Sequence, residues 1–110
     1  MLYNAALLAR LQALGPLPDA TSPAADDFPM REFDELLQQL TEPLAPAHAL
    51  ALVALGPPPD TGSFGVEAAL LSWVETLPAE TLRDLLPRMA NTEVKRLLEI
   101  RLANYFRLRS

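Results

Sequence analysis

Residues 45–55, Ala-Pro-Ala-His-Ala-Leu-Ala-Leu-Val-Ala-Leu, form the most apolar stretch of the chain, with His48 as its only polar side chain. Pro46 suits the first turn of a helix, and Gly56 followed by prolines at 57, 58 and 59 is a strong stop signal. A helix without a polar face is usually buried among other helices. The stretch therefore predicts the central helix of an all-α domain.

Amphipathic patterns on both sides of this stretch predict the surrounding helices. Apolar residues recur every three to four positions over about residues 2–14, 29–42, 64–77 and 92 onwards. A short further helix fits between Pro78 and Pro87. We therefore expect a compact bundle of five or six helices, in which the helices at 29–42, 64–77 and 92 onwards surround the central one.

Local signals predict the ends of these helices. Gly15 suits a left-handed cap after the first helix, and Tyr3 is expected on its apolar face. Residue types that commonly cap helix N-termini precede the later helices: Asp26 or Asp27, Ser63 and Asn91.

Length and composition fit a single helical domain that spans residues 1–110. Leu and Ala make up more than a third of the chain, whereas Val occurs at four positions and Ile at one, which favours helices over strands. Residues 16–29 contain four prolines and predict an irregular linker between the first two helices.

A short internal similarity keeps a second architecture open. Residues 11–19, LQALGPLPD, resemble residues 52–60, LVALGPPPD, at an offset of 41 positions. This offset lies in the range of helical-hairpin repeats, so a minimal HEAT-like stack of three helical hairpins is an alternative to the bundle. The simpler interpretation is a helix stop that the chain uses twice.

The charge distribution leads to the main functional hypothesis. The net charge is −5, with −8 on residues 1–90 and +3 on residues 91–110, so general affinity for nucleic acid is not expected. An acidic surface would speed the capture of a basic protein partner, as in small immunity, adaptor or chaperone-type proteins of bacteria. The expected contact acids lie around the second helix: Asp26, Asp27, Glu32, Asp34 and Glu35.

Two other functions remain open. Surplus Leu and Ala on the surface could make the protein a structural homo-oligomer. Alternatively, the basic last helix could bind nucleic acid or a membrane surface through five cations: Lys95, Arg96, Arg101, Arg107 and Arg109.

The sequence offers little to catalysis. A lone His48 in a chain without cysteine does not predict a zinc site. Ser63 in Thr-Gly-Ser-Phe-Gly lacks the first glycine of a nucleophile elbow and no strand precedes it. We predict no catalytic residues, metal or cofactor, and therefore a protein that is not an enzyme. Because the N-terminus is a poor signal peptide and the most apolar stretch is too short to span a bilayer, we expect a cytoplasmic location.

Overall fold

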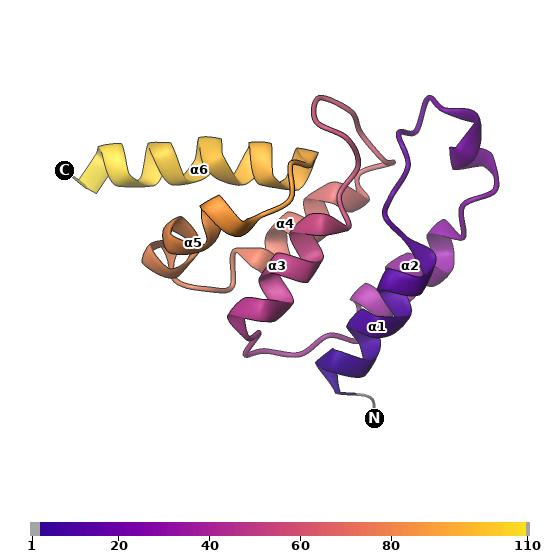
Figure 1. Ribbon diagram of the computed structural model, residues 1–110, viewed down its shortest axis with the longest axis horizontal. Helices are drawn as coiled ribbons and strands as arrows, with labels where there is room; N and C mark the ends of the chain where they lie inside the picture. Colours follow the sequence, from indigo (N-terminus) through magenta and orange to yellow (C-terminus); the bar gives the residue numbers. More distant parts are fainter. Residues whose placement is uncertain (1–2, 110) are drawn as a thin grey trace.

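The computed structural model describes residues 3–109 and is all-α in that part of the chain (Figure 1). Six α-helices follow one another within the described residues: α1 (Asn4–Leu14), α2 (Met30–Leu37), α3 (Pro46–Ala54), α4 (Val66–Val74), α5 (Ala79–Leu85) and α6 (Glu93–Arg109). Two short 3₁₀ helices, η1 (Pro23–Asp26) and η2 (Leu86–Arg88), lie before α2 and after α5. The prediction of a compact all-α domain is confirmed.

Helix α3 is the central element, as its composition predicts. It packs against α1, α4, α5 and α6, and Ala49, Leu52 and Val53 on it are fully buried. Helix α2, expected beside α3, packs instead mainly against α1 and α4. The linker at 16–29 reverses the direction of the chain, so α2 packs against α1 before the chain enters α3.

The packing order follows successive helical hairpins. Helices α1 and α2 form one pair and α3 and α4 the next, while α1 contacts α3 and α2 contacts α4 (Figure 1). The first four helices therefore have the order expected of the hairpin alternative. Helix α5 packs mainly against α3 and α6 mainly against α4, which differs from the α5–α6 pairing of a third hairpin.

The two similar Leu-Gly-Pro segments lie side by side. The Leu17 N–H donates to the carbonyl of Leu55 at 2.9 Å, just beyond the ends of α1 and α3. Gly15 does not form the expected left-handed cap, because its φ is −98°. Its small size gives close packing instead: a Cβ there would lie 3.1 Å from Leu55 Cδ2 and 3.2 Å from Phe33 Cε2, so both side chains would have to move slightly to admit it. The shared sequence thus permits close packing of two helix ends.

The linker at 16–29 is less irregular than expected. Leu17 is buried, and residues Pro23–Asp26 form η1. The Ala20 N–H donates to the Gly62 carbonyl at 2.8 Å, and Ser63 Oγ donates to the Pro18 carbonyl at 2.7 Å. The first half of the linker is therefore tied to the loop that joins α3 to α4.

Three predictions about helix N-termini are wrong. Neither Asp26 nor Asp27 caps α2: Asp26 ends η1, Asp27 follows it, and Pro29 precedes α2. Ser63 does not cap α4, because Gly65 occupies that position and the Ser63 hydroxyl bonds the linker. Asn91 does not cap α6, which begins at Glu93.

Thr92 directly precedes α6 and replaces Asn91 at its start. Its hydroxyl accepts the Lys95 N–H at 3.5 Å and donates to the Val53 carbonyl at 2.7 Å. Tyr3, expected on the buried face of α1, precedes the helix and is 86 % exposed. None of the helices between residues 3 and 109 is both long and apolar enough to cross a membrane.

Candidate binding surface

The predicted contact acids lie on α2 and the turn before it. Asp26, Asp27, Glu32 and Glu35 are exposed, and Asp34 is half-buried. Two of them have cationic neighbours: Glu32 Oε1 lies 4.0 Å from Arg10 Nη2, and Glu35 Oε1 lies 3.1 Å from Arg31 Nε.

These ion pairs leave the acids accessible. The four paired side chains are between 53 % and 92 % exposed, and such surface pairs contribute only about 0–1 kcal/mol. A partner with its own cations can therefore replace Arg10 or Arg31 at small cost. Asp34 Oδ2 accepts a hydrogen bond from Gln38 Nε2 at 2.8 Å, which directs its carboxylate along α2.

Two surface hollows that the sequence did not indicate lie along the line where α2 and α4 meet. The first, of about 490 Å³, is lined from the starts of the two helices by Met30, Arg31, Asp34, Phe64, Val66 and Ala69. The second, of about 560 Å³, is lined by residues after α2, by the last turn of α4 and by a residue after it: Leu40, Thr41, Glu42, Ser72, Trp73 and Thr76. We call these two hollows together the α2–α4 seam. Since starts meet starts and ends meet ends, the two helices run parallel.

Phe64 at the edge of the seam has an unusual backbone conformation. Its φ is +55°, in the left-handed region, and Gly65 follows with a φ of +82°. A non-glycine residue in this region is held at a cost of about 1–3 kcal/mol. The Phe64 side chain nevertheless remains 68 % exposed, so the fold places a large apolar ring in solvent.

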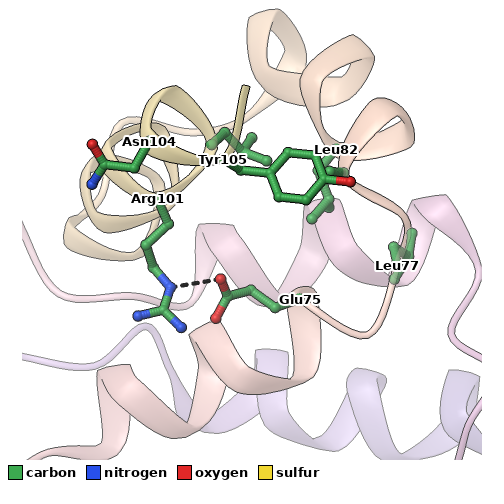
Figure 2. A pocket seen from close by; sticks show the side chains of 8 residues that line it. Glu75, Leu77, Leu82, Arg101, Asn104 and Tyr105 are labelled. Carbon is green, nitrogen blue, oxygen red and sulfur yellow. Dashed lines mark hydrogen bonds and ion pairs between the residues drawn. The ribbon is translucent and has the colours of Figure 1, made fainter. Parts of the chain in front are cut away.

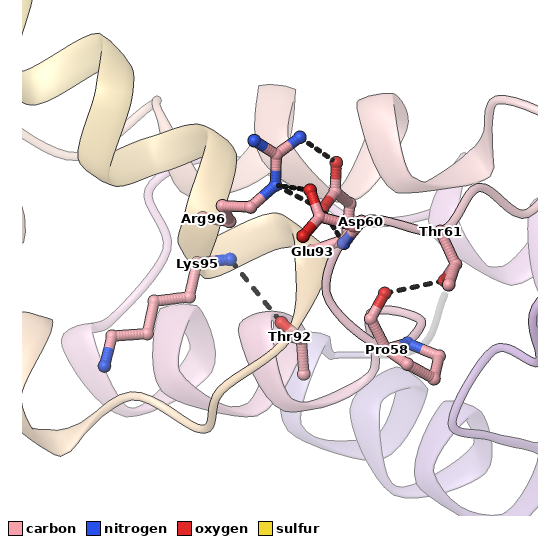
Figure 3. Close-up of polar contacts among 7 residues, drawn as sticks. All are labelled: Pro58, Asp60, Thr61, Thr92, Glu93, Lys95 and Arg96. Carbon is pink, nitrogen blue, oxygen red and sulfur yellow. Dashed lines mark hydrogen bonds and ion pairs between the residues drawn. The ribbon is translucent and has the colours of Figure 1, made fainter.

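The basic residues of α6 are partly used within the chain. Arg96 Nε and Nη2 donate to the two carboxylate oxygens of Glu93, each at 2.7 Å, and Arg96 Nε lies 3.3 Å from Asp60 Oδ1 (Figure 3). Arg101 Nε donates to Glu75 Oε2 at 2.6 Å. These pairs raise the pKa of Arg96 through its bonds to Glu93 and the pKa of Arg101 through its bond to Glu75.

The remaining predicted cations of α6 differ in exposure. Lys95 is half-buried and Arg107 is exposed, while the side chain of Arg109 lies outside the described residues. Phe106, an aromatic neighbour of the predicted patch, carries the Arg83 guanidinium 4.8 Å from its ring centroid. The helix therefore directs much of its charge and one aromatic ring at its own chain.

Glu93 is the most constrained acid of this region. Its side chain is 9 % exposed, and Oε1 accepts the Asp60 N–H at 2.7 Å (Figure 3). The hydrogen bonds from Arg96 lower the pKa of Glu93, the Asp60 N–H lowers it further, and burial opposes both. Its own N–H donates to the Pro57 carbonyl at 2.9 Å, so Glu93 fixes the loop after α3 to the start of α6.

A third groove, of about 480 Å³, lies between α6, the end of α4 and the start of α5 (Figure 2). The Arg101–Glu75 ion pair lies at one edge and Tyr105 at another, over the apolar side chains of Leu77 and Leu82. The two charges neutralise each other, so this groove has no net charge with which to select an ionic ligand.

Residues considered for catalysis are far apart in the fold. His48 lies in the first turn of α3, where its Nδ1 accepts the Ala45 N–H at 3.1 Å. Ser63 lies in the loop that follows the other end of α3 and is fully buried. Among the residues that the structure describes, no group of three or more histidines and acids has the arrangement of a metal site.

Comparison with known proteins gives no further assignment. No family model matches the sequence, no curated protein matches it significantly, and no solved structure is significantly similar.

Proposed function

We propose that this chain is a non-catalytic protein-binding module that captures a basic partner protein through the acidic surface of α2 and the turn before it. The observation that carries the proposal is a local excess of exposed acids. Residues 16–45 contain seven acids and one base, Arg31. Four of the five acids predicted as contacts in this segment are exposed.

Electrostatic complementarity gives this surface a function that needs no reactive centre. Acids gathered on one face attract a basic protein over distances of about a Debye length, roughly 8 Å at physiological ionic strength. The attraction raises the association rate and selects against acidic proteins. The affinity of the complex should therefore fall as salt is added.

The test uses a defined peptide probe and matched charge reversals. The probe is a synthetic peptide of about 18 residues made of Lys and Leu with helical spacing, and its counterpart carries Glu in place of Lys. We expect the Asp27→Lys/Glu35→Lys variant to bind the Lys peptide about tenfold more weakly than the unmodified chain in calorimetric titrations at low salt.

The control has the same change of net charge at another place. Glu80→Lys/Asp84→Lys alters two exposed acids of α5 and should change the affinity less than about threefold. Equal losses in both variants, an affinity that does not respond to salt, or equal binding of the Glu peptide would contradict the proposal.

A specific observation also favours self-association as a second function. Ile100 and Leu108, eight positions apart on α6, are 48 % and 80 % exposed, and α6 extends beyond the other helices (Figure 1). Positions i and i+8 are about 80° apart around a helix, which places them within one broad face. Sedimentation velocity over a wide concentration range decides this, since a protein that stays monomeric removes the second function.

A further inference from the structure

We infer that the basic partner presents an amphipathic helix, which lies along the α2–α4 seam with its apolar side against Phe64, Met30 and Trp73 and its cations facing acids of the seam. The inference rests on the proposed function and adds the partner's secondary structure and apolar side.

The shape of the seam suits a helix. Two parallel helices place the hollows in line: on one side, Met30 and Asp34, four positions apart on α2, line the first, and Thr41, after the end of α2, lines the second. On the other side, Val66 to Thr76 span about 15 Å at 1.5 Å per residue. A partner helix of about three turns would fill this length, as in other helix-in-groove complexes.

The apolar lining supplies contacts for such a helix. Met30 and Trp73 are partly buried and pack on the core, so each exposes one side to the seam. Phe64 is exposed and held in a left-handed conformation that glycine would adopt more easily. An apolar ring at a strained, exposed position adds nothing to the chain's own core, but it would be covered by a partner.

The charges of the seam select the partner's polar side. Asp34 lines the first hollow and Glu42 the second, so an acid occurs in each half. The lining also contains one cation, Arg31 in the first hollow, so two acids and one cation leave it a net charge of −1. Glu35, exposed and 3.1 Å from Arg31, adds a further acid beside the first hollow. The seam and its edge therefore favour cations of a partner over anions.

A second copy of the chain is a poorer occupant than another protein. Helix α6 is the basic helix of this chain, but Val94, Leu98 and Leu102 on it are buried in its own core. Arg101 on the same helix is paired with Glu75. Only Ile100 and Leu108 are large apolar residues that α6 exposes in the described part of the chain, so to offer a wider apolar side to a second copy it would have to leave its own core.

The experiment exploits Trp73, the only tryptophan of the chain, as a reporter inside the seam. The Lys/Leu peptide is compared with a peptide of the same composition whose order is shuffled so that no apolar face forms. We expect the ordered peptide to shift the Trp73 emission to shorter wavelength and to bind about tenfold more tightly than the shuffled one.

Phe64→Gly removes the ring and relieves the backbone, so the variant should fold. We expect it to bind the ordered peptide about tenfold more weakly with an unchanged salt dependence. Leu108→Ser, the control, removes another large exposed apolar side chain, on α6 and outside the lining of the seam, and should leave the affinity unchanged.

The outcomes separate the two proposals. If the α2 charge reversals weaken binding while Phe64→Gly and peptide shuffling do not, the seam inference is overturned and the proposed function stands. If the unmodified chain binds neither Lys peptide, both are overturned. A shift of Trp73 emission with protein concentration alone, without peptide, would assign the seam to a second copy and also overturn the inference.

Discussion

Replacing Glu93 by glutamine tests whether the start of α6 is fixed by a charge. The substitution keeps the shape of the side chain and one oxygen for the Asp60 N–H, which Glu93 accepts at 2.7 Å. It removes the charge that accepts two 2.7 Å hydrogen bonds from Arg96. It also brings an amide NH₂ group toward a guanidinium, and neither of these groups can accept a bond from the other.

The structure sets the size of the effect. A hydrogen bond to a charged group contributes about 1.5–3 kcal/mol when it is sheltered from water. The Glu93 side chain is 9 % exposed, but that of Arg96 is 40 % exposed, so water screens part of the interaction. We therefore expect Glu93→Gln to lower the free energy of unfolding by about 1–2 kcal/mol, or the Tm by about 5–10 °C.

The effect should depend on pH in a defined direction. The pKa of Glu93 is lowered in the folded protein, chiefly by the hydrogen bonds from Arg96. Its contribution is therefore complete above the pKa of an unfolded glutamate, about 4.3, and is lost as the pH falls through the lower folded value. Urea unfolding should show a constant difference between the two proteins from neutral to mildly acidic pH, and a shrinking one in stronger acid.

Glu99→Gln provides the matched control. Glu99 lies on the same helix but is exposed, so its substitution should change the stability by less than about 0.5 kcal/mol. If the two variants have the same stability at neutral pH, or if the deficit of Glu93→Gln persists at full size in strong acid, the ion pair does not contribute as argued.

Two further predictions concern the loop between α3 and α4. Ser63→Ala leaves the partly buried Pro18 carbonyl without its 2.7 Å bond and should cost about 0.5–1.5 kcal/mol, whereas Ser72→Ala on the exposed surface of α4 should cost little. Equal Tm values for the two variants would contradict this. Gly56→Ala places a Cβ 2.7 Å from Val94 Cγ2 and should cost about 1–3 kcal/mol. A Cβ at Gly62 would have its closest contact, with Glu67 Oε1, at an ordinary 3.4 Å, so Gly62→Ala should change the free energy of unfolding in denaturant little. Similar losses of stability in both variants would show that overpacking is not the cause.

The helices could be predicted from the sequence because their signals are local. A stretch such as residues 46–54, apolar on all sides, has few stable places other than the centre of a helical domain. The ends of the helices depend on longer-range contacts. Ser63 has the chemistry of an N-cap, yet its hydroxyl bonds a carbonyl 45 positions earlier. Thr92 directly precedes α6, and its hydroxyl donates to the Val53 carbonyl, 39 positions away.

The candidate site could also be predicted only in part. The acids around α2 are visible in the sequence, since charge and helical spacing place them on a polar face. The α2–α4 seam could not be predicted from the sequence. It forms only when α2 and α4, which α3 separates in the sequence, pack against each other in parallel. Phe64 looked like the first residue of a helix, and its positive φ depends on the loop geometry that Gly65 continues.

The charge counted along the sequence differs from the charge that is left unpaired in the folded chain. The +3 of residues 91–110 suggests a basic site, but Arg96 and Arg101 bind acids of the loop and of α4. Glu32 and Glu35 on α2 pair instead with the exposed side chains of Arg10 and Arg31, and such exposed pairs contribute weakly. Two of the five cations of residues 91–110 are thus paired with acids elsewhere in the chain, whereas the acids of α2 remain accessible. The proposal that a basic partner binds at α2 rests on this difference, which net charge along the sequence does not reveal.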